Sequence, residues 1–169
     1  MNINGNVLLD TNIVQYLASA PTSLSFINMI VDLNKKGCTM SVSEYSIFEL
    51  IRGARLKTET DLSNTFNIFK KYSVSIEVLY AAARLETLYR MENIQCDKIS
   101  DGDKIIAATS ILTNSTILTT NGRDFPWPYY QETDRDPVIF SEKNISKSIL
   151  VSSFVPDQTY IFKRFSERV

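Results

Sequence analysis

The sequence predicts an α/β domain built on a mainly parallel β-sheet. Short apolar runs that suit buried strands alternate with longer segments of helical periodicity through most of the chain. A length of 169 residues fits one domain, and 44% hydrophobic residues suffice for a core without disulfide or metal staples. We therefore expect a single domain over residues 1–169.

The alternation starts at the N-terminal end of the chain. Residues 7–9 form an apolar run that predicts a buried strand, and residues 11–18 predict the helix that follows it. A second helix is expected over residues 24–36, because its apolar positions share one face and Gly37 provides a C-cap. Residues 38–42 are short and β-prone, so they predict the next strand.

The following segments continue the pattern. Ser43 is expected to open a helix with one apolar stripe. That stripe comprises Ile47, Leu50, Ile51 and Ala54. The next expected elements are, in order, a helix over residues 62–72 with Phe66 and Phe69 turned inward, a strand over residues 74–76 and an amphipathic helix over residues 77–91.

The last clear βα signals come before residue 126. Residues 103–112 predict a helix after a glycine-containing loop, and residues 117–118 predict a buried strand. Four of the five prolines lie beyond residue 125, so we expect no long regular helix in a C-terminal extension, residues 126–169. The elements expected there are short strands over residues 138–140 and 149–154 and a terminal helix over residues 157–168, capped by Asp157.

Composition excludes several kinds of site. The chain has no histidine, which rules out His-based triads, His general bases and metal sites built on imidazole. Cys38 and Cys96 form no CxxC pair, so a reducing cytoplasm is the expected location. No membrane-spanning or signal segment is expected. Because 18 basic residues face 19 acidic ones, a nucleic-acid partner would need a local basic patch.

Acidic and amide side chains occupy the ends of the predicted elements. Asp10 follows the first strand, Asp103 opens a helix, and Asn121 and Asp124 follow the last clear strand. Glu49 lies inside a helix, on the polar face opposite the apolar stripe. Strand carboxyl ends and helix N-termini share one rim of an open α/β sheet, so these segments are expected to meet there.

Each acid also has a purely structural interpretation. As helix N-caps, Asp10 and Asp103 would stabilise the fold by roughly 0.5 to 2 kcal/mol each. A lone Glu49 fits a solvated helix face. Convergence favours a functional interpretation, because clustered carboxylates without a cation repel one another and raise their pKa values. A donor set made only of oxygen suits Mg²⁺ or Mn²⁺.

Four stretches place these acids among recurring neighbours, in the order LLDTNIVQYL, SEYSIFELIRGAR, DKIIAATSIL and ILTTNGRDF. Together they resemble the motifs of PIN-domain ribonucleases, most closely the VapC-type toxins of toxin–antitoxin pairs. The resemblance covers residues 6–125 and leaves residues 126–169 unmatched. It implies a PIN-like three-layer α/β/α sandwich, an acidic pocket for Mg²⁺ or Mn²⁺, and metal-dependent endonucleolytic cleavage of RNA.

The resemblance assigns roles residue by residue. Asp10, Glu49 and Asp103 match the acids that bind the metal and take part in catalysis. In the fourth motif, Asp124 is the candidate fourth catalytic acid, and Asn121 is a neutral ligand or a group that positions the substrate. Hydroxyl groups expected to orient the acids belong to Thr11, Ser46 and Thr119.

RNA binding requires cations near these acids. The candidates are Arg52, Arg55, Lys104 and Arg123. We expect Arg52 and Arg123 to contact phosphates, although solvated surface charges would look the same in sequence. Residues 125–130 either stack bases on Trp127 or Tyr129 or form a proline-braced plug. The resemblance further implies an antitoxin protein and a second copy of the chain as partners.

Two interpretations from other classes stay open. Asp10 after an apolar strand also resembles the first motif of haloacid-dehalogenase-like phosphatases, which use an aspartate nucleophile and Mg²⁺. That family needs a second aspartate where this chain has Asn12. The other alternative is a PIN-fold module that binds RNA or protein without cutting, which Asn121 permits and the three matched acids argue against.

Overall fold

A computed structural model describes residues 1, 3, 5–19, 21–53, 60 and 66–167 of the chain. Its strands are β1 (Asn6–Leu9), β2 (Thr39–Ser43), β3 (Lys70–Tyr72), β4 (Thr116–Thr119), β5 (Tyr130–Glu142) and β6 (Ile145–Pro156). Its α-helices are α1 (Thr11–Ala18), α2 (Ser23–Lys35), α3 (Glu44–Gly53), α5 (Ile76–Met91), α6 (Asp101–Thr113) and α7 (Gln158–Ser166). Short 3₁₀ turns, η1 (Cys96–Lys98) and η2 (Gly122–Asp124), precede α6 and follow β4.

The strands form one mixed sheet in the order β3-β2-β1-β4-β6-β5. Strands β3, β2, β1 and β4 are parallel, and Leu8 in β1 lies opposite Ser41 of β2 and Ile117 of β4. Strand β6 pairs antiparallel with β4 and with β5. The prediction of an α/β fold with a mainly parallel central sheet is confirmed.

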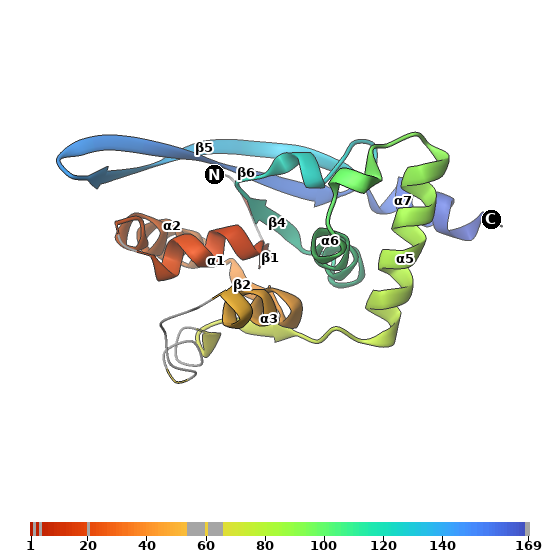
Figure 1. Cartoon of the computed structure of the whole chain (residues 1–169), viewed down its shortest axis with the longest axis horizontal. Coiled ribbons are helices and arrows are strands. Elements are labelled where there is room, and N and C mark those ends of the chain that lie inside the picture. Colours follow the sequence, from red (N-terminus) through yellow and green to blue (C-terminus); the bar gives the residue numbers. More distant parts are fainter. Residues whose placement is uncertain (2, 4, 20, 54–59, 61–65, 168–169) are drawn as a thin grey trace.

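Helices cover both faces of the parallel strands, which gives three layers (Figure 1). Because successive side chains of a strand point to opposite faces, Val7 and Leu9 pack with α1 and α2, whereas Leu8 packs with α5 and α6. All three side chains are fully buried. The apolar run of β1 therefore serves two cores, as expected of a strand buried on both faces.

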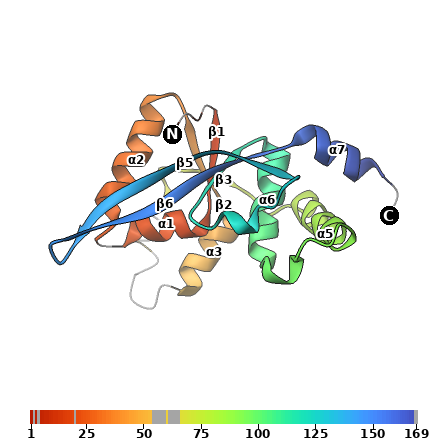
Figure 2. The same ribbon diagram turned by 90° about the horizontal axis from the view of Figure 1, so that it is seen from above.

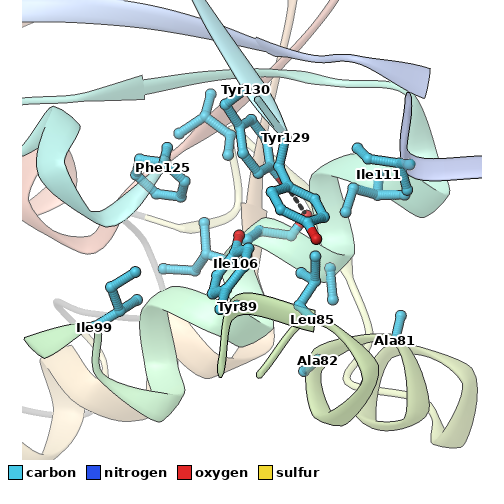
Figure 3. Packing of buried hydrophobic residues seen from close by; sticks show 14 of the residues in the cluster. Ala81, Ala82, Leu85, Tyr89, Ile99, Ile106, Ile111, Phe125, Tyr129 and Tyr130 are labelled. Carbon is cyan, nitrogen blue, oxygen red and sulfur yellow. Dashed lines mark hydrogen bonds between the residues drawn. The ribbon is translucent and has the colours of Figure 1, made fainter. Parts of the chain in front are cut away.

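The core on the α5 and α6 face also holds the segment that enters β5. Tyr129 and Tyr130 are buried there among side chains of both helices (Figure 3). The Tyr130 hydroxyl donates a hydrogen bond of 2.7 Å to the Ala107 carbonyl, drawn as a dashed line in Figure 3. The Tyr129 ring packs edge-on against Tyr89, with 4.8 Å between ring centroids. This segment is thus fixed to the helices.

Two sequence predictions near residue 70 are wrong. The helix expected through residue 72 ends earlier, because Lys70–Tyr72 forms β3, and the strand expected at residues 74–76 is a connection into α5. Pairing with β2, where Ser43 lies opposite Tyr72, overrides the local preference of this segment. Residues 62–65 of the expected helix lie outside the described residues, while Phe66 and Phe69 are buried as expected.

Helices α3 and α6 also depart from the expected patterns. In α3, Leu50 is buried, but Ile51 is 48% exposed, and Ala54 lies outside the described residues. Helix α6 begins at Asp101 rather than at Asp103, because Ser100, three residues before Asp103, provides the N-cap. Among the described residues, no helix is long and apolar enough to cross a membrane.

The C-terminal strands are much longer than the short strands predicted. Strands β5 and β6 make a hairpin of 13 and 12 residues that reaches beyond α2 in both views (Figures 1 and 2). Pro137 lies inside β5, which is the edge strand of the sheet, where a missing backbone N–H is tolerated. The terminal helix is confirmed as α7, and the Asp157 side chain caps it by accepting from the Tyr160 amide at 2.8 Å.

Candidate active site

Asp10 lies where β1 passes into α1, at the carboxyl end of the parallel strands. Its side chain is the N-cap of α1 and accepts from the Thr11 amide at 2.6 Å. The same carboxylate accepts from Asn12 Nδ2 at 2.5 Å and from Thr119 Oγ1 at 2.6 Å. The last contact joins β1 to β4. Asp10 is only 2% exposed, so this carboxylate is held by neutral donors away from solvent.

Burial dominates the titration of Asp10. It raises the pKa of Asp10 to about 6, while the hydrogen bonds from Thr119, Thr11 and Asn12 pull the pKa down. The negative charge of Asp103 raises it further. The structural interpretation of Asp10 as an N-cap is therefore correct but incomplete, since a simple cap at the surface carries no such electrostatic cost.

Asp124 lies in η2, directly after β4, and is 7% exposed. Asn121 Nδ2 donates to its Oδ2 at 2.5 Å, and the Asn121 amide donates to Thr119 Oγ1 at 2.9 Å. Burial, followed by the charges of Asp103 and Asp10, raises the pKa of Asp124 to about 7. The structure thus uses Asn121 to position Asp124.

Asp103 and Glu49 reach the same rim from two helices. Asp103 forms a capping box with Ser100, whose hydroxyl donates to Asp103 Oδ2 at 2.6 Å. Glu49 Oε2 accepts from Thr11 Oγ1 at 2.6 Å, and Thr11 is the residue that follows Asp10. A Cβ atom added to Gly102 would lie 3.2 Å from Glu49 Oε1. Glu49 is therefore held between the segments that carry Asp10 and Asp103.

Asp10, Glu49, Asp103 and Asp124 are called the acidic rim below. Electrostatic coupling links Asp10, Asp103 and Asp124, and hydrogen bonding through Thr11 brings in Glu49. The structure thus brings together the four acids that the sequence analysis singled out. Two of the hydroxyls expected to orient them, those of Thr11 and Thr119, do contact acids of the rim. The third, Ser46 Oγ, is buried and has no hydrogen-bond partner among the described residues.

Tyr45 and Gly102 belong to the site and were missed by the sequence analysis. A Cβ on Gly102 would meet Tyr45 Cε1 at 2.3 Å, so the Tyr45 ring lies directly on the glycine backbone. Burial raises the pKa of Tyr45, the charge of Glu49 raises it further, and Arg52 opposes them. The available signal was the glycine between two aspartates at the start of a helix, a position that favours close approach over helix propensity.

The donor set of the acidic rim suits a hard divalent cation. Its four side chains offer only carboxylate oxygens, which Mg²⁺ and Mn²⁺ prefer. Burial, followed by the charges of neighbouring aspartates, raises the pKa values of Asp10 and Asp124, so a cation bound at the rim would favour their charged forms. In the described part of the chain, no group of three or more acidic or cysteine side chains forms a ready-made metal site. The residues therefore fit the ion by chemistry and charge rather than as a closed cage.

The positive charges of the four motifs are placed unequally. Arg123 is exposed beside the rim, and Arg52 is exposed with its guanidinium 5.5 Å from the centre of the Phe48 ring. Lys104 is instead buried and bonds Glu86 at 3.1 Å and Asp101 at 3.2 Å. The expectation that Lys104 serves the site is wrong, because adjacent helical residues point about 100° apart and Lys104 faces α5. Arg55 lies outside the described residues.

Residues 125–130 were expected either to stack bases or to form a plug, and Trp127 and Tyr129 differ in this respect. Tyr129 is buried and packs on Tyr89 and Tyr160, so the proposal that it stacks bases is wrong and the plug interpretation holds for it. Trp127 is 81% exposed. The buried Tyr129 ring therefore anchors this segment to the core, while the Trp127 ring, two residues earlier, faces solvent.

The structure also bears on the phosphatase alternative. Asn12, which stands where that family needs a second aspartate, donates from Nδ2 to Asp10 and to Thr119 Oγ1 at 3.1 Å. Its Oδ1 accepts from the Thr120 amide at 3.1 Å. Both ends of the amide are thus occupied in joining β1 to β4. Asn12 positions Asp10 and offers no acid group for phosphoryl transfer.

Known proteins resemble this chain in sequence and in fold. Two proteins named Ribonuclease VapC19, from Mycobacterium tuberculosis strains CDC 1551 and H37Rv, are 32% identical to this chain over 120 residues, which are 70% of this chain and 91% of theirs. A crystal structure of VapBC2 from Rickettsia felis bound to a promoter DNA fragment has a TM-score of 0.58 at 23% identity, covering 71% of this chain and 90% of that one.

Two further solved structures share the fold. A toxin–antitoxin complex from Klebsiella pneumoniae has a TM-score of 0.57 at 22% identity, covering 72% of this chain and 92% of its own. The FitAcB structure from Neisseria gonorrhoeae has a TM-score of 0.57 at 18% identity, covering 70% and 90%. No protein-family model matches the chain. Each relative is covered over nearly its whole length, so this chain is longer than they are.

Proposed function

The chain belongs to the VapC-like family of PIN-domain ribonucleases, and from that premise we propose that it is a metal-dependent endoribonuclease, the toxin of a toxin–antitoxin pair. The observation that carries this proposal is the acidic rim. Its acids come from four separate segments of the chain, and neutral donors fix them where burial, followed by the charges of neighbouring acids, raises the pKa values of Asp10 and Asp124. A divalent cation from solution is the partner that this arrangement lacks.

We propose that Asp10, Glu49 and Asp103 hold Mg²⁺ or Mn²⁺. When bound, such an ion supplies positive charge that stabilises the phosphorane and the leaving oxygen. The protein supplies orientation. Thr119 and Asn12 fix the carboxylate of Asp10, Thr11 fixes Glu49, and Ser100 fixes Asp103, as the hydrogen bonds above support.

Asp124 is the proposed general base. Asn121 holds one of its oxygens, so the carboxylate is aimed before substrate arrives. It takes a proton from the water that attacks phosphorus. The new phosphorus–oxygen bond replaces the bond to the leaving 3′ ribose oxygen, which takes up a proton from solvent, giving a 5′-phosphate and a 3′-hydroxyl. Arg123 and Arg52, exposed beside this chemistry, are proposed to contact the phosphates of the RNA.

An antitoxin protein and a second copy of the chain are the proposed partners. Structures of similar fold include a toxin–antitoxin complex and VapBC2 bound to promoter DNA, which supports a protein partner for this chain as well. Co-expression with the product of a neighbouring small gene, followed by affinity purification and light scattering, tests both assemblies. Recovery of the chain alone as a monomer would contradict both.

The nuclease proposal is tested by incubating the purified chain with a labelled, structured RNA pool. Reactions contain Mg²⁺ or Mn²⁺, or EDTA, and the matched control is Asp10→Asn. Cleavage that needs both the metal and Asp10 supports the proposal. If no lane is cut and neither metal raises the melting temperature, the rim binds no cation and the non-catalytic PIN-fold module replaces the nuclease.

A further inference from the structure

A cavity of about 580 Å³ opens beside the acidic rim, between the turn after β4 and the hairpin of β5 and β6. The turn contributes Asn121, Arg123 and Trp127 to its wall, and the hairpin contributes Gln131, Arg135 and Leu150. Asn121 is also the residue that donates to Asp124. This space, called the hairpin cavity below, therefore lies next to Asp124 through their shared neighbour Asn121, and its volume suits a small organic group.

Trp127 is held in an exposed position at this cavity. Its neighbours Phe125 and Tyr129 are buried in the core on the α5 and α6 face, so the chain is fixed on both sides of it. The indole itself is 81% exposed and lines a second cavity of about 660 Å³ with Pro128 and Tyr160. A large ring left in water by a well-packed segment forgoes a substantial hydrophobic stabilisation. A ligand that covers the ring would recover it.

The charge of the hairpin cavity favours an anion. The charged residues of its wall are Arg123, Glu132 and Arg135. Glu132 accepts from Arg135 at 2.7 and 2.8 Å, so that pair is neutral overall. Arg123 forms no salt bridge with any residue that the structure describes, which leaves a net positive charge next to an exposed aromatic ring. Aromatic rings beside guanidinium groups are how proteins hold single-stranded nucleic acid.

The two walls of the cavity are tightly joined. A Cβ atom added to Gly122 would lie 2.5 Å from Phe154 Cζ, so the turn that carries Arg123 rests on the ring of a β6 residue. Strand β6 is also bonded to β4, with Phe154 opposite Ile117. The hairpin and the turn therefore form one rigid frame, and the cavity is shaped before any ligand binds.

We propose that the hairpin cavity binds a nucleotide of the RNA next to the bond that is cut, with its base stacked on Trp127 and its phosphate at Arg123. The inference rests on the proposed nuclease function and adds a specificity site to it. The C-terminal hairpin, which the four motifs do not include, supplies one wall. It would thus select which single-stranded stretch of RNA reaches the acidic rim.

Trp127 is the only tryptophan in the chain, so its fluorescence reports directly on this cavity. The experiment titrates Asp10→Asn protein, which should bind RNA without cutting it, with a short single-stranded RNA oligonucleotide in EDTA. We expect saturable quenching. Anisotropy of a labelled RNA then compares variants in the same background. Trp127→Ala should weaken binding about 5- to 150-fold, the range for loss of one base stack, and Trp127→Phe should retain most of the binding.

Phe162→Ala is the matched control, because Phe162 on α7 is 78% exposed and does not line the cavity. It should leave RNA binding unchanged. In the chain with Asp10 intact, Trp127→Ala should lower kcat/KM by a similar factor. Arg123→Ala should weaken binding and reduce its dependence on salt.

The possible outcomes separate this inference from the nuclease proposal. If Asp10-dependent cleavage occurs but Trp127→Ala changes neither binding nor kcat/KM, the base site is wrong and the nuclease stands. Saturable quenching without cleavage in any metal supports the base site and counts against the nuclease. Quenching by an antitoxin-derived peptide, with none by RNA, overturns the inference and assigns the cavity to protein.

Discussion

Acidic side chains occur in two contrasting settings in this molecule. On α5, Glu86 accepts from Arg90 at 2.7 Å and from Lys104 at 3.1 Å, and these partners hold the pKa of Glu86 below its usual value. At the acidic rim, the described donors to Asp10 and Asp124 are all neutral, and burial raises both pKa values. The same functional group is therefore paired at one place and left uncompensated at the other.

This contrast indicates which acids serve the fold and which serve chemistry. An acid next to a cation adds modestly to the free energy of unfolding, as surface ion pairs do. Acids that are packed together without a cation raise the free energy of the folded state, so the fold alone does not account for them. The fixed orientation of the rim by Thr11, Asn12 and Thr119 means that this arrangement is built rather than accidental.

The largest expected difference between the two settings is in the rate of RNA cleavage, when Asp10→Asn is compared with Glu86→Gln. Both changes replace a carboxylate with an isosteric amide. Asp10→Asn should lower the RNA cleavage rate by about 100-fold or more, because it removes a proposed ligand of the ion. Glu86→Gln should change the rate by less than about threefold, since it affects only the ion pairs that Glu86 forms with Arg90 of α5 and with Lys104 of α6.

Initial cleavage rates, with circular dichroism to verify folding, provide the measurement. Equal losses in the two variants would remove the functional distinction between the rim and the paired acids. Retained activity in Asp10→Asn, and in Asp103→Asn as well, would contradict the proposed site itself.

Gly102→Ala probes the geometry of the rim without altering its charge. The new methyl group would meet the Tyr45 ring at 2.3 Å and crowd Glu49 Oε1 at 3.2 Å, so both must move. We expect cleavage to fall about 10- to 100-fold through misplacement of Glu49. The free energy of unfolding should fall by about 1 to 3 kcal/mol through overpacking.

Gly53→Ala in α3 is the control for Gly102→Ala, because a Cβ there meets no atom of the described structure within 4 Å. It should be neutral or slightly stabilising and should keep full activity. Denaturant unfolding and cleavage assays on both variants give the comparison. Wild-type activity in a folded Gly102→Ala protein would show that Glu49 needs no precise placement.

The sequence located the acids better than it located their surroundings. Helix α1 matched its expected bounds, because the apolar run of β1 ends at Asp10, a strong capping residue. The shared rim followed from a rule about parallel sheets, and the four acids do lie there. The capping box of Ser100 and Asp103 was also visible as a pattern, yet it was missed, and α6 was therefore started two residues late.

Features that depend on distant pairing could not be predicted from local patterns. Strand β3 exists because β2 offers it a parallel partner, and the length of β5 and β6 follows from their pairing with each other. The prolines suggested short strands, but only a known position at the sheet edge shows that Pro137 is tolerated. Likewise, Lys104 faces Glu86 rather than the rim only because α5 packs beside α6.

A pH titration of stability without metal should reveal the cost of the uncompensated rim. Unfolded aspartate titrates near pH 4, whereas folded Asp10 and Asp124 titrate at about 6 and about 7. The folded chain thus binds more protons across this window, so the free energy of unfolding should fall as pH rises from about 4 to 7. The two shifts set an upper limit of about 7 kcal/mol on this decrease. Chemical denaturation in EDTA at a series of pH values measures it.

Glu86 and Glu132, whose pKa values are lowered, gain their stabilisation as pH rises through the low end of this window, toward the unfolded glutamate pKa, and should not obscure the slope above about pH 5.5. Asp124→Asn should flatten the slope. Mg²⁺ or Mn²⁺ should raise the melting temperature more at about pH 8 than at about pH 5.5, because protons compete with the ion. A metal effect that is independent of pH would place the ion away from the rim.

Ser100→Ala and Asp157→Ala should lower the free energy of unfolding by similar amounts. Any difference between their cleavage rates then reports on the acidic rim alone. Each removes a side-chain N-cap, of α6 and of α7 respectively, so each should cost about 0.5 to 2 kcal/mol. Only Ser100 also holds a rim acid, through its 2.6 Å bond to Asp103 Oδ2. Ser100→Ala should therefore weaken metal binding and slow cleavage several-fold, whereas Asp157→Ala should do neither. Parallel thermal melts, metal titrations and rate measurements separate the two caps. Equal effects on cleavage would mean that loss of stability, not the orientation of Asp103, explains the result.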